Sequence, residues 1–172
     1  MLHYAYTRSP LGPILVAGDG EGLRHVSFEA GTCPRHPEPD WRPSDGPLRD
    51  AVAQLGAYFA GDLRAFDLRL APHGTPFQRA VWDVLRQIPY GETISYGELA
   101  RRIGDPRAAR AVGAANGQNP LPVVIPCHRV IGGDGRLTGF RGGLHLKRSL
   151  LALERRVLAG PLPTSLDRGA AA

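Results

Sequence analysis

The sequence has few of the residues that bind metals or build disulfide frameworks, and it has no long apolar run. Among 172 residues only Cys33 and Cys127 are cysteines, which cannot fill a four-ligand zinc site by themselves and show no metal-ligand spacing. Two cysteines also argue against a disulfide framework. No stretch approaches the length of a membrane span, and the first residues lack a basic leader followed by an apolar core. We therefore expect a cytoplasmic protein with reduced thiols and no membrane partner.

Lysine is almost absent as well, because Lys147 is the only lysine among 21 basic residues. The formal net charge of +5 is therefore carried by guanidinium groups, which suit phosphate recognition. The charge is unevenly placed, since residues 97–156 contain 11 basic and 4 acidic residues. This half suits a polyanion such as nucleic acid, although basic surfaces also occur without such a partner.

The first seventy residues have the pattern of a small sheet domain. Apolar and polar residues alternate in "LHYAYT", "PILVAG" and "LRHVSFE", which predicts short antiparallel strands separated by glycine-containing turns. A proline-rich loop follows over 31–47. Helical spacing in "LRDAVAQLGAYFAG" then predicts a helix, and "FDLRL" is expected to return a strand to the sheet. We expect this domain to span 1–70, followed by a linker over 71–74.

The second half begins with a strong helix signal. Thr75 is placed as an N-cap, Pro76 takes the first helical position and Gln78 completes a capping box. The expected apolar face of this helix consists of Phe77, Ala80, Val81, Val84, Leu85 and Ile88.

Two further short helices are predicted after it. The capping box "SYGE" starts a helix at Ser95 that should end near Gly104, and Asp105 and Pro106 are placed as the cap and first position of the next helix. The tight turn between them makes a helix-turn-helix candidate, with an ordinary helical hairpin as the alternative.

The end of the chain is predicted to contain a strand over "PVVIPC", a hairpin at "GGDG" and a last helix over 143–155. This last helix carries Leu144, Leu150 and Leu151. The second domain is therefore expected to span 75–158, and the proline, glycine and alanine content of 159–172 predicts a flexible tail.

Cys127 permits two interpretations. A free cysteine beside an apolar run is often buried and inert. Alternatively, His128, Arg129 and the polar residues Asn119 and Glu154 could lower the pKa of the thiol and orient a base. Adjacent residues in an extended strand point to opposite faces, so His128 can act on the sulfur only across a turn or through a bridging water.

The motif "PCHRV", preceded by "NP" and an apolar run and followed by "GGLHLKRSLLALE", resembles the active-site signature of the O6-alkylguanine-DNA alkyltransferases, also called methylated-DNA–protein-cysteine methyltransferases. The similarity is collinear from Thr75 to Glu154. It implies an α/β (α+β) fold, in which a small antiparallel, ribonuclease H-like sheet domain precedes a mainly helical domain with a helix-turn-helix.

The resemblance also implies roles for individual residues. Cys127 would take the alkyl group from alkylated guanine, and from O4-alkylthymine, onto its own sulfur. His128 would act as base through a water, Glu154 would orient the imidazole, Asn119 would brace the turn and Tyr96 would offer a hydroxyl near the base. No group in such a site can cleave the resulting thioether, so each molecule would act once and would need no cofactor.

The helix "RAARAVGAAN" is nearly bare of side chains that could read base edges. Small residues let a helix backbone approach the minor groove, which is only about 6 Å wide. By resemblance, Arg110 would fill the stack vacated by a flipped nucleotide. The residues expected nearest the groove are Ala109, Val112, Gly113 and Ala114. The expected partner is double-stranded DNA with alkylated guanine, bound by a monomer, with cooperativity left open.

The expected substrate pocket is lined by Tyr96, Val130, Phe140, Arg141 and Gly142. Phe140 stands where many relatives have tyrosine, and Arg141 where some have a smaller residue, which leaves the alkyl preference open. The chain lacks the N-terminal Cys/His set that binds zinc in some relatives, so no metal is expected.

Three other functions remain as alternatives. A non-catalytic relative would bind alkylated DNA and flag the lesion, but such a protein has another residue at the position of Cys127. A Cys-His hydrolase would need an oxyanion hole that nothing in the sequence suggests. A regulatory role could be added, although no separate effector domain is visible.

Overall fold

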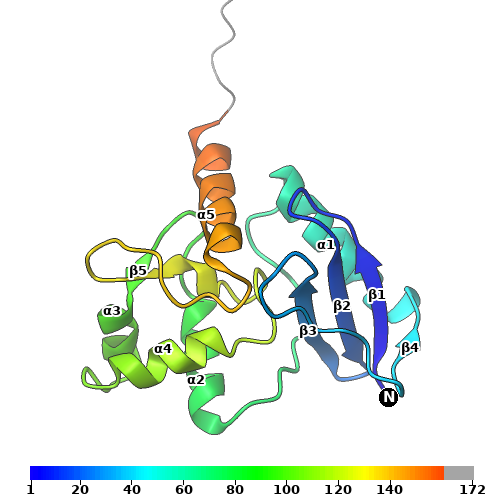
Figure 1. Cartoon of the computed structure of the whole chain (residues 1–172), viewed down its shortest axis with the longest axis horizontal. Coiled ribbons are helices and arrows are strands. Elements are labelled where there is room, and N and C mark those ends of the chain that lie inside the picture. Colours follow the sequence, from blue (N-terminus) through cyan, green and yellow to red (C-terminus); the bar gives the residue numbers. More distant parts are fainter. Residues whose placement is uncertain (161–172) are drawn as a thin grey trace, which may run out of the picture.

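The computed structural model describes residues 1–160 and has an α/β fold, with a small sheet followed by a mainly helical half. Figure 1 shows the sheet and its helix on one side of the molecule and most of the remaining helices on the other. Most of the tail expected over 159–172, namely 161–172, lies outside the described residues.

The sheet has four strands in the order β3-β2-β1-β4. The three strands expected from alternation are confirmed as antiparallel neighbours: β1 (His3–Thr7), β2 (Ile14–Asp19) and β3 (Gly22–Phe28). A two-residue strand, β4 (Arg42–Pro43), pairs in parallel with β1 inside the loop expected over 31–47.

One helix covers the sheet, as predicted. A short 3-10 turn (Gly46–Leu48) leads into α1 (Arg49–Ala60), which ends at Gly61 in the left-handed conformation that glycine tolerates. Its buried residues Leu55, Tyr58 and Phe59 join the main core with the inward residues of β2 and β3. The opposite sheet face is covered by Trp41 in a separate small cluster.

The expected strand over 66–70 is not formed. Only Leu70 makes an isolated parallel bridge, to Leu23 at the start of β3. The backbone of Leu23 donates to the carbonyl of Arg69 at 2.8 Å and accepts from Ala71 at 2.9 Å. The segment therefore lies beside the sheet edge without continuing its ladder.

The helical half contains four helices and one small sheet within the described residues. The helices are α2 (Pro76–Leu85), α3 (Tyr96–Arg102), α4 (Ala109–Gly117) and α5 (Leu144–Ala159). The strands β5 (Ile94–Ser95) and β6 (Val130–Ile131) pair in parallel. The expected "GGDG" hairpin is a tight turn in which Gly132 donates to Arg136, because β6 pairs with β5 rather than with a following strand.

The capping box of α2 is confirmed, with Thr75 accepting from the Gln78 amide and Gln78 accepting from the Thr75 amide. Its expected apolar face is only partly right. Phe77 and Ala80 are exposed, and Trp82 is buried instead and donates its indole N–H to the carbonyl of Ala115 at 2.9 Å.

The next two helix starts differ from expectation in different ways. Ser95 caps α3, but Glu98 does not complete a capping box because its carboxylate pairs with Arg101 and Arg102. Asp105 closes a turn by accepting from the Arg107 amide, so α4 begins only at Ala109. The two helices still form a helix-turn-helix arrangement, with contacts between α3 and α4.

The two halves share one continuous hydrophobic core. Val26 of β3 donates its backbone N–H to the carbonyl of Pro120 at 2.9 Å, and Tyr58 of α1 reaches Glu154 of α5. Side chains from the sheet half can therefore act directly on groups in the helical half.

Candidate active site

Cys127 lies where the chain turns sharply, not in the strand expected over 122–127. Val123 has a φ of 74°, which a β-branched residue adopts only at a cost of about 1–3 kcal/mol. The amide of Ile125 donates to Leu121 at 2.8 Å, and the amide of Cys127 donates to Ile125 at 2.8 Å. Cys127 then begins a 3-10 turn (Cys127–Arg129), so Cys127 and His128 are not held on opposite faces of a strand.

Two buried asparagines brace this turn. Asn119 donates its side-chain amide to the carbonyl of Ile125 at 2.8 Å and accepts from the Leu121 amide at 2.9 Å. Asn116, at the end of α4, donates to the carbonyl of Cys127 at 3.3 Å. The bracing role expected for Asn119 matches these contacts, whereas sequence reasoning did not single out Asn116.

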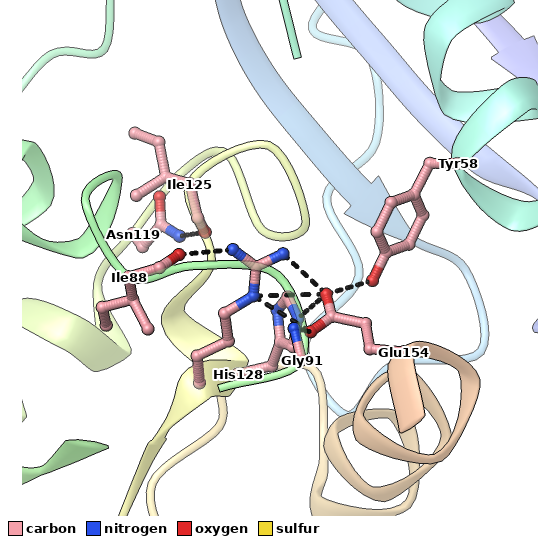
Figure 2. Close-up of polar contacts among 8 residues, drawn as sticks. Tyr58, Ile88, Gly91, Asn119, Ile125, His128 and Glu154 are labelled. Carbon is pink, nitrogen blue, oxygen red and sulfur yellow. Dashed lines mark hydrogen bonds and ion pairs between the residues drawn. The ribbon is translucent and has the colours of Figure 1, made fainter. Parts of the chain in front are cut away.

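Glu154 lies at the centre of a buried polar network. Figure 2 shows its carboxylate between Tyr58 on one side and His128 on the other. It accepts from the Tyr58 hydroxyl and from His128 Nε2, each at 2.8 Å, and from the Gly91 amide at 3.0 Å. The Arg129 guanidinium pairs with both carboxylate oxygens and also donates to the Ile88 carbonyl at 2.7 Å.

The carboxylate of Glu154 is ionised in this network. Burial alone would raise its pKa, but the hydrogen bonds from His128 and Arg129 outweigh burial and hold the pKa well below its usual range. Since an ionised carboxylate only accepts hydrogen bonds, the proton between the two side chains must lie on His128 Nε2. The hydrogen bond thus fixes the tautomer of the ring.

His128 is fully buried and neutral at physiological pH. Burial lowers its pKa, although Glu154 opposes this shift. With the hydrogen on Nε2, the other ring nitrogen, Nδ1, has a free lone pair. Within residues 1–160, Nδ1 has no protein hydrogen-bond partner. His128 is therefore arranged as a base at Nδ1.

The thiol of Cys127 is only 4% exposed, and its pKa is high. Burial raises this pKa to about 11, although Asn119 and Lys147 act in the opposite direction. The expectation that polar neighbours lower the thiol pKa is wrong for this state, because desolvation outweighs them and Arg129 is engaged with Glu154. At neutral pH the thiol is therefore protonated, and chemistry at its sulfur would need a base to remove the proton.

Tyr96 and Lys147 meet at one backbone carbonyl. The Tyr96 hydroxyl donates to the carbonyl of Thr138 at 2.9 Å, and the Lys147 ammonium donates to the same oxygen at 2.8 Å and to Val130. Lys147 is fully buried, and burial lowers its pKa to about 8. The hydroxyl that was expected to face a substrate base thus holds the loop after β6 in this state.

A cavity of about 220 Å³ opens beside Cys127, between the two halves of the chain. Of the expected pocket residues, Phe140, Arg141 and Gly142 line it, whereas Tyr96 and Val130 are not among its lining residues. The sheet half contributes Phe28, Cys33 and Arg35 to its wall. No sequence pattern indicates that these three residues face the same cavity as Cys127.

Helix α4 presents small residues and one arginine to solvent. Arg110 and Ala114 are exposed, and Ala109 and Gly113 are partly exposed. Val112 differs from expectation, because its side chain is fully buried in the core and cannot face a groove. Arg110 makes no ion pair with any residue in the described part of the chain.

Two further site residues, Tyr58 and Lys147, escaped sequence reasoning for a physical reason. Tyr58 lies in the segment "LRDAVAQLGAYFAG", which was predicted only as a helix, because an amphipathic tyrosine in a core has the same spacing as any hydrophobe. Lys147 lies on the buried face of α5, although lysine side chains are rarely fully buried in proteins. Its isolation among arginines was the one signal that could have marked it.

Residues 1–160 contain no group of three or more histidine, cysteine, aspartate or glutamate side chains placed to hold a metal ion. Among the helices of the same residues, none is long and apolar enough to cross a membrane.

Two family models match the chain and together span nearly all of the described residues. Residues 2–72 match the ribonuclease-like domain of 6-O-methylguanine DNA methyltransferase. Residues 76–156 match the DNA binding domain of 6-O-methylguanine DNA methyltransferase.

Individual proteins show the same similarity over nearly their whole length. A methylated-DNA–protein-cysteine methyltransferase of Methanosarcina acetivorans is 52% identical over 89% of this chain and 98% of its own length. The protein of that name from Mycobacterium tuberculosis is 51% identical over 90% of this chain and 93% of its own. The crystal structure of Mycobacterium tuberculosis OGT in complex with DNA superposes with a TM-score of 0.82, at 51% identity over 89% of this chain and 92% of that one.

Proposed function

Because this chain belongs to the 6-O-methylguanine DNA methyltransferase family, we propose that Cys127 is the residue onto which it transfers the alkyl group of damaged DNA. The chain is a methylated-DNA–protein-cysteine methyltransferase, a DNA-binding repair enzyme that is consumed by its own reaction. The proposal concerns the residues that carry out the transfer, the lesions they act on and the route by which a lesion reaches them.

The observation that carries the proposal is the hydrogen bond between His128 Nε2 and the Glu154 carboxylate, from which the tautomer of His128 follows. Glu154 accepts from Nε2, which leaves Nδ1 as a base directly after a buried, protonated thiol. We infer that Nδ1 removes the thiol proton through a bridging water, and that Glu154, held in place by the Tyr58 hydroxyl, stabilises the imidazolium that forms. Because this base removes the proton, the Cys127 sulfur can react although the pKa of its thiol is high.

The reaction exchanges a proton for an alkyl group. The Cys127 sulfur attacks the alkyl carbon, a carbon–sulfur bond forms and the bond from that carbon to the guanine O6 breaks. The proton that leaves the thiol is balanced by the proton that the departing guanine takes up. Tyr96 is proposed to offer its hydroxyl to the base once it leaves the Thr138 carbonyl. A thioether has no good leaving group, so each chain reacts once.

The lesion is proposed to enter by base flipping through the minor groove. Ala109, Gly113 and Ala114 allow the backbone of α4 to approach DNA closely, and Arg110 carries an exposed planar cation that can occupy the vacated stack. The lesions proposed are O6-alkylguanine and O4-alkylthymine, since both carry an alkyl group on an exocyclic oxygen. The partner is a DNA duplex with such a base, bound by one copy of the chain.

Mass measurement of the tryptic peptide spanning 111–129 tests the assignment of the acceptor. After incubation with a duplex containing O6-methylguanine, this peptide should carry one methyl group, located on Cys127. Cys127→Ser should still bind the duplex but should accept no methyl group, because a serine hydroxyl has a far higher pKa. Methylation of Cys33 or of another peptide would contradict the assignment. Methylation of Cys127 by a duplex with O4-methylthymine tests the second lesion.

A non-catalytic, lesion-flagging protein is the alternative that the sequence left open. Cys127 with its adjacent base argues against it, since a flagging protein has no use for an alkyl acceptor. The same incubation separates the two functions, because a flagging protein would bind the duplex and leave its own mass unchanged.

A further inference from the structure

The loop that lines the cavity beside Cys127 is held by a residue from the sheet half of the chain. We call residues 139–143 the pocket loop. Thr32 donates its backbone N–H to the carbonyl of Gly142 at 3.1 Å and its hydroxyl to the carbonyl of Arg141 at 2.7 Å. Both polar donors of one residue are therefore used on two consecutive carbonyls of a loop 109 positions away.

Neighbours of Thr32 bring the two backbones into close approach. A Cβ atom at Gly31 would lie 3.2 Å from the carbonyl oxygen of Gly142, closer than most side chains allow. His145, at the start of α5, contacts the carbonyl of Ala30 through Nε2 at 3.2 Å. Gly31 in turn donates to Phe28 at the end of β3 at 3.1 Å. We call the two hydrogen bonds from Thr32 to the pocket loop the clamp. The clamp is thus anchored to the sheet.

The pocket loop is supported internally by the buried side chain of Phe140 and by a hydrogen bond from the Gly143 N–H to the Phe140 carbonyl at 2.9 Å. Residues 132–143 form neither helix nor strand, and Gly139 and Gly143 both have positive φ angles. Lys147 and Tyr96 hold the residue before the loop, Thr138. Segments without regular secondary structure open easily, so the conformation of the loop depends on the anchoring of Phe140 and on the bonds at the two ends of the loop.

We propose that Thr32 is a positioning residue for the transfer reaction: it fixes the pocket loop and so lets the sheet half shape the substrate site. The proposal rests on the function proposed above, in which the pocket beside Cys127 receives the alkylated base. A displacement of about 1 Å at a reacting centre can cost about a hundredfold in rate, so a loop that is free to move slows the reaction.

Thr32→Val tests this directly, because it keeps the shape and the backbone N–H and removes only the hydroxyl. Loss of one hydrogen bond corresponds to about a two- to tenfold change in the closed population of the loop. We expect the single-turnover rate at saturating methylated duplex to fall by about that factor. The duplex concentration at half-saturation should not change, since Thr32 is not on α4. Thr32→Ser retains the hydroxyl and should restore the rate.

Ser9→Ala is the matched control. Ser9 also donates its hydroxyl to a backbone carbonyl at 2.7 Å, that of Gly12, but in the turn between β1 and β2. If Thr32 mattered only for stability, the two variants would lose activity in parallel with their melting temperatures. A full rate in Thr32→Val, or equal loss in Ser9→Ala, would overturn the proposal.

Hydrogen exchange gives a readout that does not depend on activity. Amides of the pocket loop should exchange faster in Thr32→Val than in the unmodified chain or in Ser9→Ala. Unchanged hydrogen exchange in the pocket loop would overturn the proposal even if the transfer rate fell. An unmodified chain that transfers no methyl group would instead refute the proposed function, and the exchange comparison would still decide whether the clamp exists.

Discussion

One carboxylate, that of Glu154, organises the chemistry of the proposed site. It accepts from the side chains of Tyr58, His128 and Arg129 and from the backbone of Gly91, and it is wholly buried. A buried carboxylate with so many donors stays ionised, and its ionisation decides which nitrogen of His128 is protonated. The basicity of His128 Nδ1 is therefore a consequence of a residue on α5.

Glu154→Gln is expected to reduce both stability and transfer. The amide removes the negative charge that compensates the buried Arg129, and breaking a buried ion pair in this way costs about 3–5 kcal/mol. It also frees the tautomer of His128, so the transfer rate should fall by about a hundredfold or more. Denaturant unfolding and single-turnover methyl transfer measure the two effects.

Glu98→Gln is the matched control for that change. Glu98 also pairs with two basic side chains, those of Arg101 and Arg102, but on the surface of α3. Exposed pairs contribute little to stability, so this variant should behave like the unmodified chain. Equal losses of stability and transfer rate in both glutamate variants would contradict the role assigned to Glu154.

The thiol of Cys127 should show its high pKa in its reaction with a small electrophile. In a Cys33→Ser background, the rate of alkylation by iodoacetamide should rise about tenfold per pH unit from pH 7 and level off only near the pKa of about 11. The pKa is raised rather than lowered because burial disfavours the charged thiolate. In denaturant the same profile should level off near pH 8.5. A native profile that is flat above pH 8 would contradict the assigned burial.

Single residues differed in how far the sequence revealed them. Cys127, His128 and Glu154 were found because they belong to one collinear motif. Tyr58 and Thr32 come from the other half of the chain, and no local pattern connects them to that motif. The raised pKa of Cys127 was also missed, because desolvation depends on packing that spacing does not show.

At the scale of elements, α4 carries the proposed contact with DNA. Arg110→Ala should slow repair of a methylated duplex by about tenfold or more, because unstacking costs a few kcal/mol that the guanidinium no longer offsets. It should barely affect transfer from free O6-benzylguanine, if the pocket admits that base, because no flipping is needed. Arg110→Lys should be intermediate, since it keeps the charge without the planar surface.

Arg107→Ala is the control for charge alone, because Arg107 is exposed in the turn before α4. It should weaken duplex binding modestly without separating the two substrates. Equal losses on both substrates in Arg110→Ala, together with a lower melting temperature, would show that Arg110 is structural.

Elements with a local signal were predicted well. Alternation located β1, β2 and β3, and the capping box located the start of α2. The apolar run before Cys127 was wrongly predicted as a strand, because a short apolar run fits a buried turn as well as a strand. Val123 is buried in the core with a positive φ that a β-branched residue disfavours, so its residue preference does not predict this turn.

At the scale of the whole molecule, the basic half should dominate affinity for undamaged DNA. If its arginines neutralise phosphates, the logarithm of the binding constant should fall linearly with the logarithm of salt concentration, with a slope of about −0.9 per phosphate contacted. Titration of an unmodified duplex at several salt concentrations measures this slope. A binding constant that is independent of salt would argue for a small-molecule substrate.

The two halves form one working unit, since they share a core and since Tyr58 and Thr32 of the sheet half contact groups of the helical half. The sequence does not reveal these contacts between the halves, because each half has the sequence pattern of a separate domain. The charge asymmetry was visible, because it requires only a count of residues along the chain.

The proposed function depends on a single event, in which each molecule transfers one alkyl group to Cys127 and then stops. Its most direct test is the mass of the intact protein during incubation with an excess of duplex carrying O6-methylguanine. We expect the chain to gain one methyl group, repaired guanine to appear in equal amount and the reaction to end there. Continued appearance of repaired guanine beyond one per chain, or repair without a change in the mass of the protein, would contradict it.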